Sequence, residues 1–356
     1  MRLVNQFSIN VFGECFKKVF CAVFILLYCI IGKGQDVHFS QFFEAPLWRN
    51  PSLAGLFNGD IRFQGVYRTQ WGAVTVPYQT GSFNGEYKMP IGGADDFLTL
   101  GGQIVFDRAG TTRFTTTSLL PAVNYHKSLS GDRNTYLSVG FMGGMVQRSI
   151  DRSKITTSSQ FDGSGYNPFL DINEDIANYN TTYGDASVGM SFSSQIGESE
   201  YDNFFVGAAY HHFNRPVNSF YRDPDVELNP KWVYSLGVRM GLTPNTYLDI
   251  QADFNKQGTY SEVLAGAMVG FGLSGYDFSE SVYNIHFGAF TRWGDAIIPV
   301  VKLDFVPFTA AFSYDINISQ LRTVSQGIGG FEFSLSYIGF LERHNSSKNA
   351  ILCPRF

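Results

Sequence analysis

Charged residues, cysteines and long apolar runs are all scarce in this chain. Charged side chains make up 16% of its 356 residues, against about 25% in an ordinary globular protein. The one uninterrupted apolar run, residues 19–31, is too short to cross a bilayer as a helix, so the sequence excludes a helical membrane protein. A hydrophobic content of 44% and an aromatic content of 16% also exclude a disordered chain.

The N-terminal run has the features of a secretory signal. Lys17 and Lys18 precede it, and small residues at Gly32 and Gly34 fit a cleavage site. We therefore expect residues 1–34 to be a signal peptide cleaved between Gly34 and Gln35. A lipoprotein site at Cys29 is the weaker alternative, because a bulky tyrosine precedes that cysteine.

Export changes the charge and the cysteine count of the mature chain. Removal of residues 1–34 takes away four basic residues and one acidic residue, so the net charge falls from −5 to −8. Nucleic-acid binding selects basic surfaces, so nucleic acid is not an expected partner. Three of the four cysteines leave with the signal, and Cys353 alone cannot form an intramolecular disulfide.

Apolar and polar residues alternate with period two through most of the mature sequence. In residues 97–106, Leu100 and Ile104 fall on one face, and Thr99 and Gln103 fall on the other. The polar face carries mainly Ser, Thr, Asn, Gln, Gly and Tyr rather than the Lys and Glu of a water-soluble sandwich. Aromatic residues stand near the segment ends, as in the girdles of a transmembrane barrel: Tyr67, Trp71, Tyr87, Tyr136, Tyr201, Tyr210, Trp232, Tyr247, Tyr283, Trp293 and Tyr337.

The alternating segments predict fourteen strands, an even number, as bacterial outer-membrane barrels have. A spanning sheet must close, because an open edge would leave backbone groups unpaired in hydrocarbon. The predicted fold is therefore an all-β, transmembrane antiparallel β-barrel of the outer-membrane type. The predicted strands are 60–70, 78–89, 97–108, 113–127, 134–149, 183–197, 201–214, 231–243, 245–256, 259–271, 282–293, 297–306, 307–316 and 328–339.

Strand parity predicts which ends of the strands face the cell exterior. The longest loops, 150–182 and 215–230, follow the fifth and seventh strands and should be extracellular, with both termini periplasmic. We divide the mature chain into a lead segment at 35–58, a barrel at 59–339 and a polar tail at 340–356. The lead segment shows no alternation, so it is interpreted as a periplasmic extension, with a position inside the lumen as the alternative.

Catalytic and metal-binding patterns are weak. His211 and His212 are adjacent on a predicted strand and should point to opposite faces, so they cannot share a metal. Residues 171–175 resemble the start of a calcium loop, but Ile176 and Thr182 replace its glycine and glutamate. No nucleophile, histidine and acid converge on one face. We therefore predict no enzyme activity and no cofactor; surface calcium stays possible but unsupported.

Several arginines within or beside the strands predict a charged lumen. They could pair with Asp249, Asp253 and Glu332 and fill the interior, or they could line an ion-selective pore. The sequence favours the filled lumen without excluding the open one. These arginines are Arg49, Arg62, Arg68, Arg113 and Arg292.

Short motifs along the whole mature chain resemble the PorP/SprF family of outer-membrane proteins, which serve type IX secretion and gliding in Bacteroidota. They begin with QDVHFSQF at 35–42, APL at 45–47 and NPSLAG at 50–55, and end with CPRF at 353–356. Between these lie YRTQW at 67–71, HFNRP at 212–216, YDIN at 314–317 and GGFE at 329–332. The motif residues that we single out as structural or docking elements are Asn50, Pro51, Tyr67, Arg68, Trp71, Pro77, His212, Asn214, Pro216, Leu321, Arg322 and Glu332.

The resemblance implies a non-enzymatic barrel in the outer membrane of a Gram-negative, Bacteroidota-type cell, which helps to export or anchor surface proteins such as gliding adhesins. Expected partners are an adhesin client, periplasmic type IX secretion components and the lipid bilayer. A passive channel or hydrophobic-solute transporter is the alternative, and an outer-membrane hydrolase is a more distant one. Exposed apolar residues on a periplasmic lead would form a docking surface; the candidates are His38, Phe39, Phe42, Phe43, Leu47 and Trp48. Covering of the barrel's inner mouth is the alternative role for these residues.

Overall fold

The structure is a computed structural model that describes residues 36–72, 75–92, 95–130, 133–174, 178–196, 202–274, 282–320 and 322–341. The chain divides into two compact units, Met1–Asp36 and Val37–Phe356. The expected signal peptide, its cleavage site, Leu321 and the C-terminal motif with Cys353 lie outside the described residues. All the strands and helical turns given below belong to the second unit.

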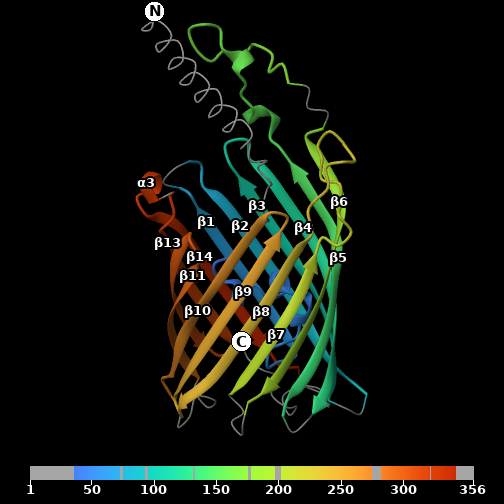
Figure 1. The fold of residues 1–356 in the computed structure, drawn as a ribbon, viewed down its shortest axis with the longest axis vertical. Helices are drawn as coiled ribbons and strands as arrows, with labels where there is room; N and C mark the ends of the chain where they lie inside the picture. The colour runs from blue at the N-terminus through green and yellow to red at the C-terminus, as the bar shows by residue number, and fades with distance from the viewer. Residues whose placement is uncertain are drawn as a thin grey trace, which may run out of the picture. The chain divides into compact units, whose positions relative to one another are not determined.

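Fourteen antiparallel strands form a closed barrel in sequence order, with β1 hydrogen-bonded to β14 (Figure 1). This confirms the predicted fold class. The strands are β1 (Ile61–Gln70), β2 (Tyr78–Ile91), β3 (Asp96–Ala109), β4 (Phe114–Ser130), β5 (Thr135–Ser149), β6 (Asn180–Gln195), β7 (Asn203–His211), β8 (Lys231–Thr243), β9 (Thr246–Gln257), β10 (Tyr260–Gly272), β11 (Tyr283–Arg292), β12 (Ala296–Phe305), β13 (Phe308–Asn317) and β14 (Ile328–Gly339).

The alternation in each strand separates a lipid-type surface from a polar interior. On β3, Leu100 and Ile104 are each 46% exposed, whereas Thr99 and Gln103 are fully buried. A water-soluble protein would bury the leucine and isoleucine instead. The apolar outside and polar inside are those of a barrel that crosses a membrane. No helix among the described residues is long and apolar enough to span a membrane.

The two ends of the barrel differ in loop length. The long connections, 150–179 and 212–230, both lie at the end where odd-numbered strands finish, here called the long-loop end. The opposite, short-turn end includes the two-residue connections 244–245 and 306–307. The loop positions agree with the predicted parity. The connection after β10 includes residues 275–281, which lie outside the described residues.

Residues 37–57, called the plug from here on, lie inside the barrel. The plug contains three short helical turns: η1 (Phe42–Glu44), α2 (Pro46–Arg49) and η2 (Pro51–Leu53). In Figure 1 its blue turns are visible behind strands β7–β9. Its hydrogen bonds reach inward-facing side chains on opposite sides of the ring, including Asn124 on β4 and Arg292 on β11.

The interpretation of this segment as an exposed periplasmic lead is therefore wrong for the described residues. Near its start, the carbonyl of His38 accepts from Arg68, close to the long-loop end of β1. Past its end, the Asp60 backbone amide donates to Gly339 at the short-turn end of β14. The chain thus runs the length of the lumen before β1 turns back, so Val37 and His38 lie toward the long-loop end rather than at the periplasmic side.

The aromatic girdle is only partly as expected. Tyr67, Tyr283 and Trp293 face outward and are 44%, 57% and 79% exposed. Tyr136 and Tyr247 are buried instead, because their places in the alternation point into the lumen. Tyr136 packs against Phe97, which is also buried.

Candidate functional site: the lumen plug and its charge network

Apolar side chains of the plug rest on apolar patches of the inner wall. Phe42 and Phe43 pack with Phe290 of β11, with ring centroids 5.5 and 5.0 Å away. Leu47 packs with Leu120 of β4 and Met142 of β5. Each fully buried side chain of this size contributes roughly 1.5–3 kcal/mol. These contacts explain why the first part of β12 is apolar on both faces: Ile298 and Val300 of that strand point toward the plug.

The helical turns of the plug begin at prolines, which favour the first turn of a helix. Pro46 opens α2, and Pro51 opens η2. Asn50 caps the second turn, since its Oδ1 accepts from the Ser52 backbone amide at 2.9 Å. Because each turn is only three or four residues long, the segment carries no periodic pattern.

Four motifs that are far apart in sequence meet at one buried network. Two backbone amides of the plug, those of Ser40 and Gln41, donate to the Glu332 carboxylate at 2.8 and 2.7 Å. Arg68 of β1 lies 2.8 Å from Asp315 and 3.4 Å from Glu332. Arg292 of β11 also donates to the Ser40 hydroxyl at 2.7 Å. The network ties the start of the plug to β1, β11, β13 and β14.

A second ion pair fixes the middle of the plug. Arg49 lies 2.5 Å from Asp253 of β9 and donates to Gln251 at 2.8 Å. Its guanidinium also lies over the rings of Phe42 and Phe205, at 4.8 and 5.0 Å from their centroids. Planar guanidinium groups suit such combined pairing and stacking.

Further contacts hold the plug near the short-turn end. Glu44 pairs with Lys302 of β12 at 2.7 Å. Glu86 of β2 accepts from the Gly55 backbone amide at 2.8 Å and also pairs with Arg62. Buried charges are costly unless they are paired in this way.

On the β4–β6 side the plug approaches the wall at backbone distance. Asn124 of β4 donates to the carbonyls of Ser52 and Ala54, both at 2.7 Å. A Cβ at Gly140 or Gly189 would overlap Pro51 or Asn50, respectively. Glycine at these two wall positions therefore allows the plug to seat.

Most of the arginines that the sequence predicted in a charged lumen form ion pairs there. Arg49, Arg62, Arg68 and Arg292 all form buried ion pairs. Asp249 pairs with Arg239 of β8, which the sequence analysis had not singled out. Arg113 is an exception, because it sits in the β3–β4 turn with φ 49° and is exposed.

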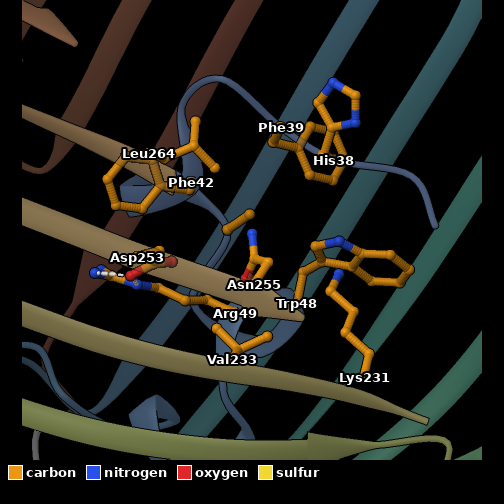
Figure 2. A pocket seen from close by; sticks show the side chains of 11 residues that line it. His38, Phe39, Phe42, Trp48, Arg49, Lys231, Val233, Asp253, Asn255 and Leu264 are labelled. Atoms are coloured by element: carbon orange, nitrogen blue, oxygen red, sulfur yellow. Dashed lines mark hydrogen bonds and ion pairs between the residues drawn. The ribbon is translucent and has the colours of Figure 1, made fainter. Parts of the chain in front are cut away.

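Most of the proposed docking residues are not on a surface. Phe39, Phe42, Phe43 and Leu47 are at most 7% exposed. The interpretation of an exposed docking surface is therefore wrong for them. Half-buried His38 and Trp48 face the small cavity in Figure 2, where the Lys231 ammonium lies 5.5 Å from the Trp48 ring centroid. That cavity measures about 20 Å³, which suits a single water molecule.

Four of the motif residues, Arg68, Glu332, Asn50 and Pro51, meet at the plug. The other motif residues are dispersed. Tyr67 faces outward, and Trp71 packs on Tyr78 at 4.7 Å between ring centroids. His212 bonds Asp185 at 2.8 Å, and Asn214 donates to the Gly184 carbonyl at 2.7 Å. Pro77 and Arg322 are exposed, and Pro216 is buried.

Sequence reasoning missed several plug contacts, namely Ser40, Gln41, Glu44, Glu86, Lys302 and Asp315. A usable signal was present for Glu86, Lys302 and Asp315, which lie in strands. A charged residue inside an alternating strand, on the side opposite the apolar face, needs an opposite charge or a hydrogen-bond donor within the lumen. Ser40, Gln41 and Glu44 lie in the plug, outside any alternating strand, and the backbone amides of Ser40 and Gln41 leave no trace in the sequence.

The histidine pair is arranged differently from expectation. β7 ends at His211, and His212 has φ 55°. The alternation of side chains along a strand therefore does not extend to His212, and the two imidazole ring centroids lie 6.3 Å apart. His211 contacts Ser187 and the Arg49 carbonyl, whereas His212 contacts Asp185. Among the described residues, no group of three or more His, Cys, Asp or Glu side chains could hold a metal ion.

The acidic loop between β5 and β6, called the outer loop from here on, forms hydrogen bonds within itself. The Asp162 carboxylate accepts from the Ser164 and Gly165 backbone amides at 3.0 and 3.1 Å. These bonds lower the pKa of Asp162, with Ser164 the largest contributor. Asp171 and Glu174 of the suggested calcium loop are exposed, and Asp175 and Ile176 lie outside the described residues.

Solved structures share the barrel architecture at low similarity. CdiB from Acinetobacter baumannii is 10% identical with a TM-score of 0.45; the alignment covers 78% of this chain and 60% of CdiB, so this chain spans less than two thirds of that protein. The TodX monoaromatic hydrocarbon channel is 9% identical with a TM-score of 0.46, covering 83% of this chain and 93% of TodX. The translocator domain of the autotransporter NalP from Neisseria meningitidis is 9% identical with a TM-score of 0.38, covering 78% and 88%. No curated protein matches the sequence.

A comparison with family patterns identifies the family of the chain. The pattern of the type IX secretion system membrane protein PorP/SprF matches residues 31–337. That stretch includes the plug and all of the barrel except the last two residues of β14. The chain therefore belongs to the PorP/SprF family of type IX secretion system membrane proteins.

Proposed function

We propose that this protein is a closed, non-enzymatic anchor of the type IX secretion machinery in the outer membrane, with residues 1–34 removed near Gly34/Gln35. One observation carries the proposal: the lumen holds a segment bonded to opposite walls, at Asn124 of β4 on one side and Arg292 of β11 on the other. A passive channel needs a continuous water path, and a segment bonded across the lumen argues against one. A filled barrel is suited to holding partners at its two ends.

The long-loop end is the proposed site for a surface client such as an adhesin, because the longer loops of outer-membrane barrels are typically extracellular. Its loops expose large apolar side chains, among them Phe161, Phe169 and Tyr221 at 61%, 94% and 59%. Exposed aromatic residues on ordered loops are typical of protein-binding surfaces. The short-turn end is the proposed side for periplasmic components of the machinery.

Conductance in planar bilayers tests the closed state. We expect the purified wild-type barrel to insert without a large steady conductance. A stable, client-independent conductance of nanosiemens size, as open porins of similar size give, would instead support the channel alternative.

Co-purification tests the client side. A Phe169→Ser, Tyr221→Ser variant should lose its surface client while the barrel stays folded. Leu100→Ser on the lipid-facing side of β3 is the control and should keep the client. Equal client recovery by both variants would argue against docking through these loops.

A further inference from the structure

The outward faces of the strands carry almost no charge, as contact with lipid requires. The exceptions among the described strand residues are Asp96 and Arg108 on β3, Lys127 on β4 and Lys256 on β9. Asp96 and Lys127 lie at the short-turn end, where the carboxylate and the ammonium group are 2.9 Å apart. These two charges therefore balance each other on the outer face.

Lys256 has no such balance. It is the last residue but one of β9, so it lies at the long-loop end. Its side chain is exposed, and it forms no ion pair with any residue that the structure describes. The nearest acids on β9 and β10, Asp253 and Glu262, face the lumen and are buried. Lys256 is thus an unmatched positive charge on the outer face of the barrel.

Two further hydrogen-bond donors flank Lys256. Trp232 on β8 and Ser261 on β10 are its direct partners in the sheet register, on strands that lie side by side in Figure 1. Direct partners point to the same face, with Cβ atoms about 4.5–5.5 Å apart. Trp232 is 41% exposed, and Ser261 is exposed as well. The three residues, called the cation patch from here on, present an ammonium, an indole N–H and a hydroxyl to an acceptor.

The cation patch lies at the depth of lipid headgroups. Trp232 stacks on Tyr210 of β7 and on Tyr234 of β8, with ring centroids 4.4 and 6.0 Å away. Tyr and Trp rings favour the boundary between headgroups and hydrocarbon. The next outward pair from the strand ends, Tyr234 and Phe254, is 48% and 40% exposed on the lipid-facing side. A ligand of the patch must therefore lie partly within the membrane, as a lipid does and a soluble acidic protein does not.

We propose that Lys256, Trp232 and Ser261 bind the phosphate of an anionic lipid headgroup in the leaflet at the long-loop end. Phosphate oxygens accept hydrogen bonds from all three donors, and a lysine ammonium supplies the opposite charge. Binding here goes beyond the proposed function, because it requires neither a closed lumen nor a surface client.

Quenching of tryptophan fluorescence by brominated lipids tests the proposal. The purified full chain carries Trp71→Phe, which removes a tryptophan on a distant strand and leaves Trp232 and Trp293 to report on lipid near the patch. Vesicles are phosphatidylcholine with a minor fraction of phosphatidic acid, and either lipid is brominated in turn. We expect phosphatidic acid to be enriched about fivefold beside these rings over the bulk bilayer. About 1 M salt should reduce the enrichment by screening.

Two variants localise the binding. Lys256→Gln should lower the enrichment about fivefold, to the level of the bulk bilayer. Arg108→Gln is the matched control: Arg108 is also an outward cation and the last residue but one of its strand, but β3 lies on another side of the ring. It should leave the enrichment unchanged. Unfolding temperatures report whether each barrel is intact.

Either of two results would overturn the inference. Equal quenching by the two brominated lipids in the parent chain would mean that the aromatic rings contact lipid without selecting its headgroup. An equal loss in Lys256→Gln and Arg108→Gln would mean that overall charge, and not the patch, attracts the lipid. Neither result would alter bilayer conductance or client recovery, so failure here is distinguishable from failure of the proposed function.

Discussion

Arg68 and Glu332 show how single residues hold the plug in place. They are direct partners in the β1–β14 register and are buried on the lumen side. The Arg68 guanidinium contacts the carboxylates of Asp315 and Glu332 as well as the Ser40 hydroxyl. Removing one member of a buried ion network leaves its partners without compensation, which typically costs about 3–5 kcal/mol.

Arg68→Met should therefore destabilise the barrel by about 3–5 kcal/mol. The measurement is urea unfolding in detergent, followed by tryptophan fluorescence. Arg322→Met is the matched control, since Arg322 also belongs to a family motif but is exposed in α3 (Arg322–Ser325). Its effect should stay within about 0.5 kcal/mol. Similar losses in both variants would contradict the network's role.

At the scale of elements, the plug depends on glycines in the wall strands. On β6, Gly189 lies against Asn50, and a side chain there would collide with it. On the same strand, a Cβ at Gly184 would meet its nearest neighbour at 3.8 Å, an ordinary contact.

We expect Gly189→Val to unseat the plug and Gly184→Val to leave it seated. The displaced plug should open a water path, so single-channel recordings should show a new conductance for the first variant. If both variants stay closed, or if both conduct, the close approach at Gly189 does not control seating.

Two residues of equal exposure can test whether the outer face of the strands meets lipid or water. Ile104 on β3 and Val226 in the β7–β8 loop are each 46% exposed, but only Ile104 faces the expected lipid. An arginine costs about 2–4 kcal/mol at the lipid-facing midplane of a barrel and little in water.

Ile104→Arg should therefore lower the free energy of unfolding from lipid vesicles by about 2–4 kcal/mol, whereas Val226→Arg should change it by less than about 1 kcal/mol. The measurement is urea-dependent folding into vesicles. Equal effects would mean that the outer face of β3 does not meet hydrocarbon.

Strand positions were predictable because alternation is a local property of the sequence. β8, for example, has the predicted bounds of 231–243, and β14 those of 328–339. The ends of β7 were not predictable: the pattern continued to 214, but the left-handed conformation of His212 ends the strand at His211. Backbone reversals of this kind depend on loop contacts, here between Asn214 and Gly184.

Across the whole molecule, the site was harder to predict than the fold. The lumen charges were visible as arginines and acids within alternating strands, yet their pairing depends on closure, which brings β1 beside β14. The plug was harder still. Its aromatic side chains have the composition of an exposed binding segment, and only the apolar patches inside the barrel, such as Phe290 and Ile298, show that they are covered.

Closure by the plug is the central claim, and it concerns the whole molecule: the lumen of a membrane barrel is filled by residues 37–57. Ser52 in the plug is fully buried, whereas Ser164 in the outer loop is exposed. A single cysteine at each position, in a chain whose Cys353 is replaced by serine, reports the access of water-borne reagents.

The most direct measurement is the labelling rate of these two cysteines by a bulky, membrane-impermeant maleimide in opened outer-membrane vesicles, where the reagent reaches both faces. Ser52→Cys should stay unlabelled until the barrel is denatured, while Ser164→Cys reacts at once in the folded protein. Rapid labelling of Ser52→Cys in the folded barrel, at a rate close to that of Ser164→Cys, would contradict the account.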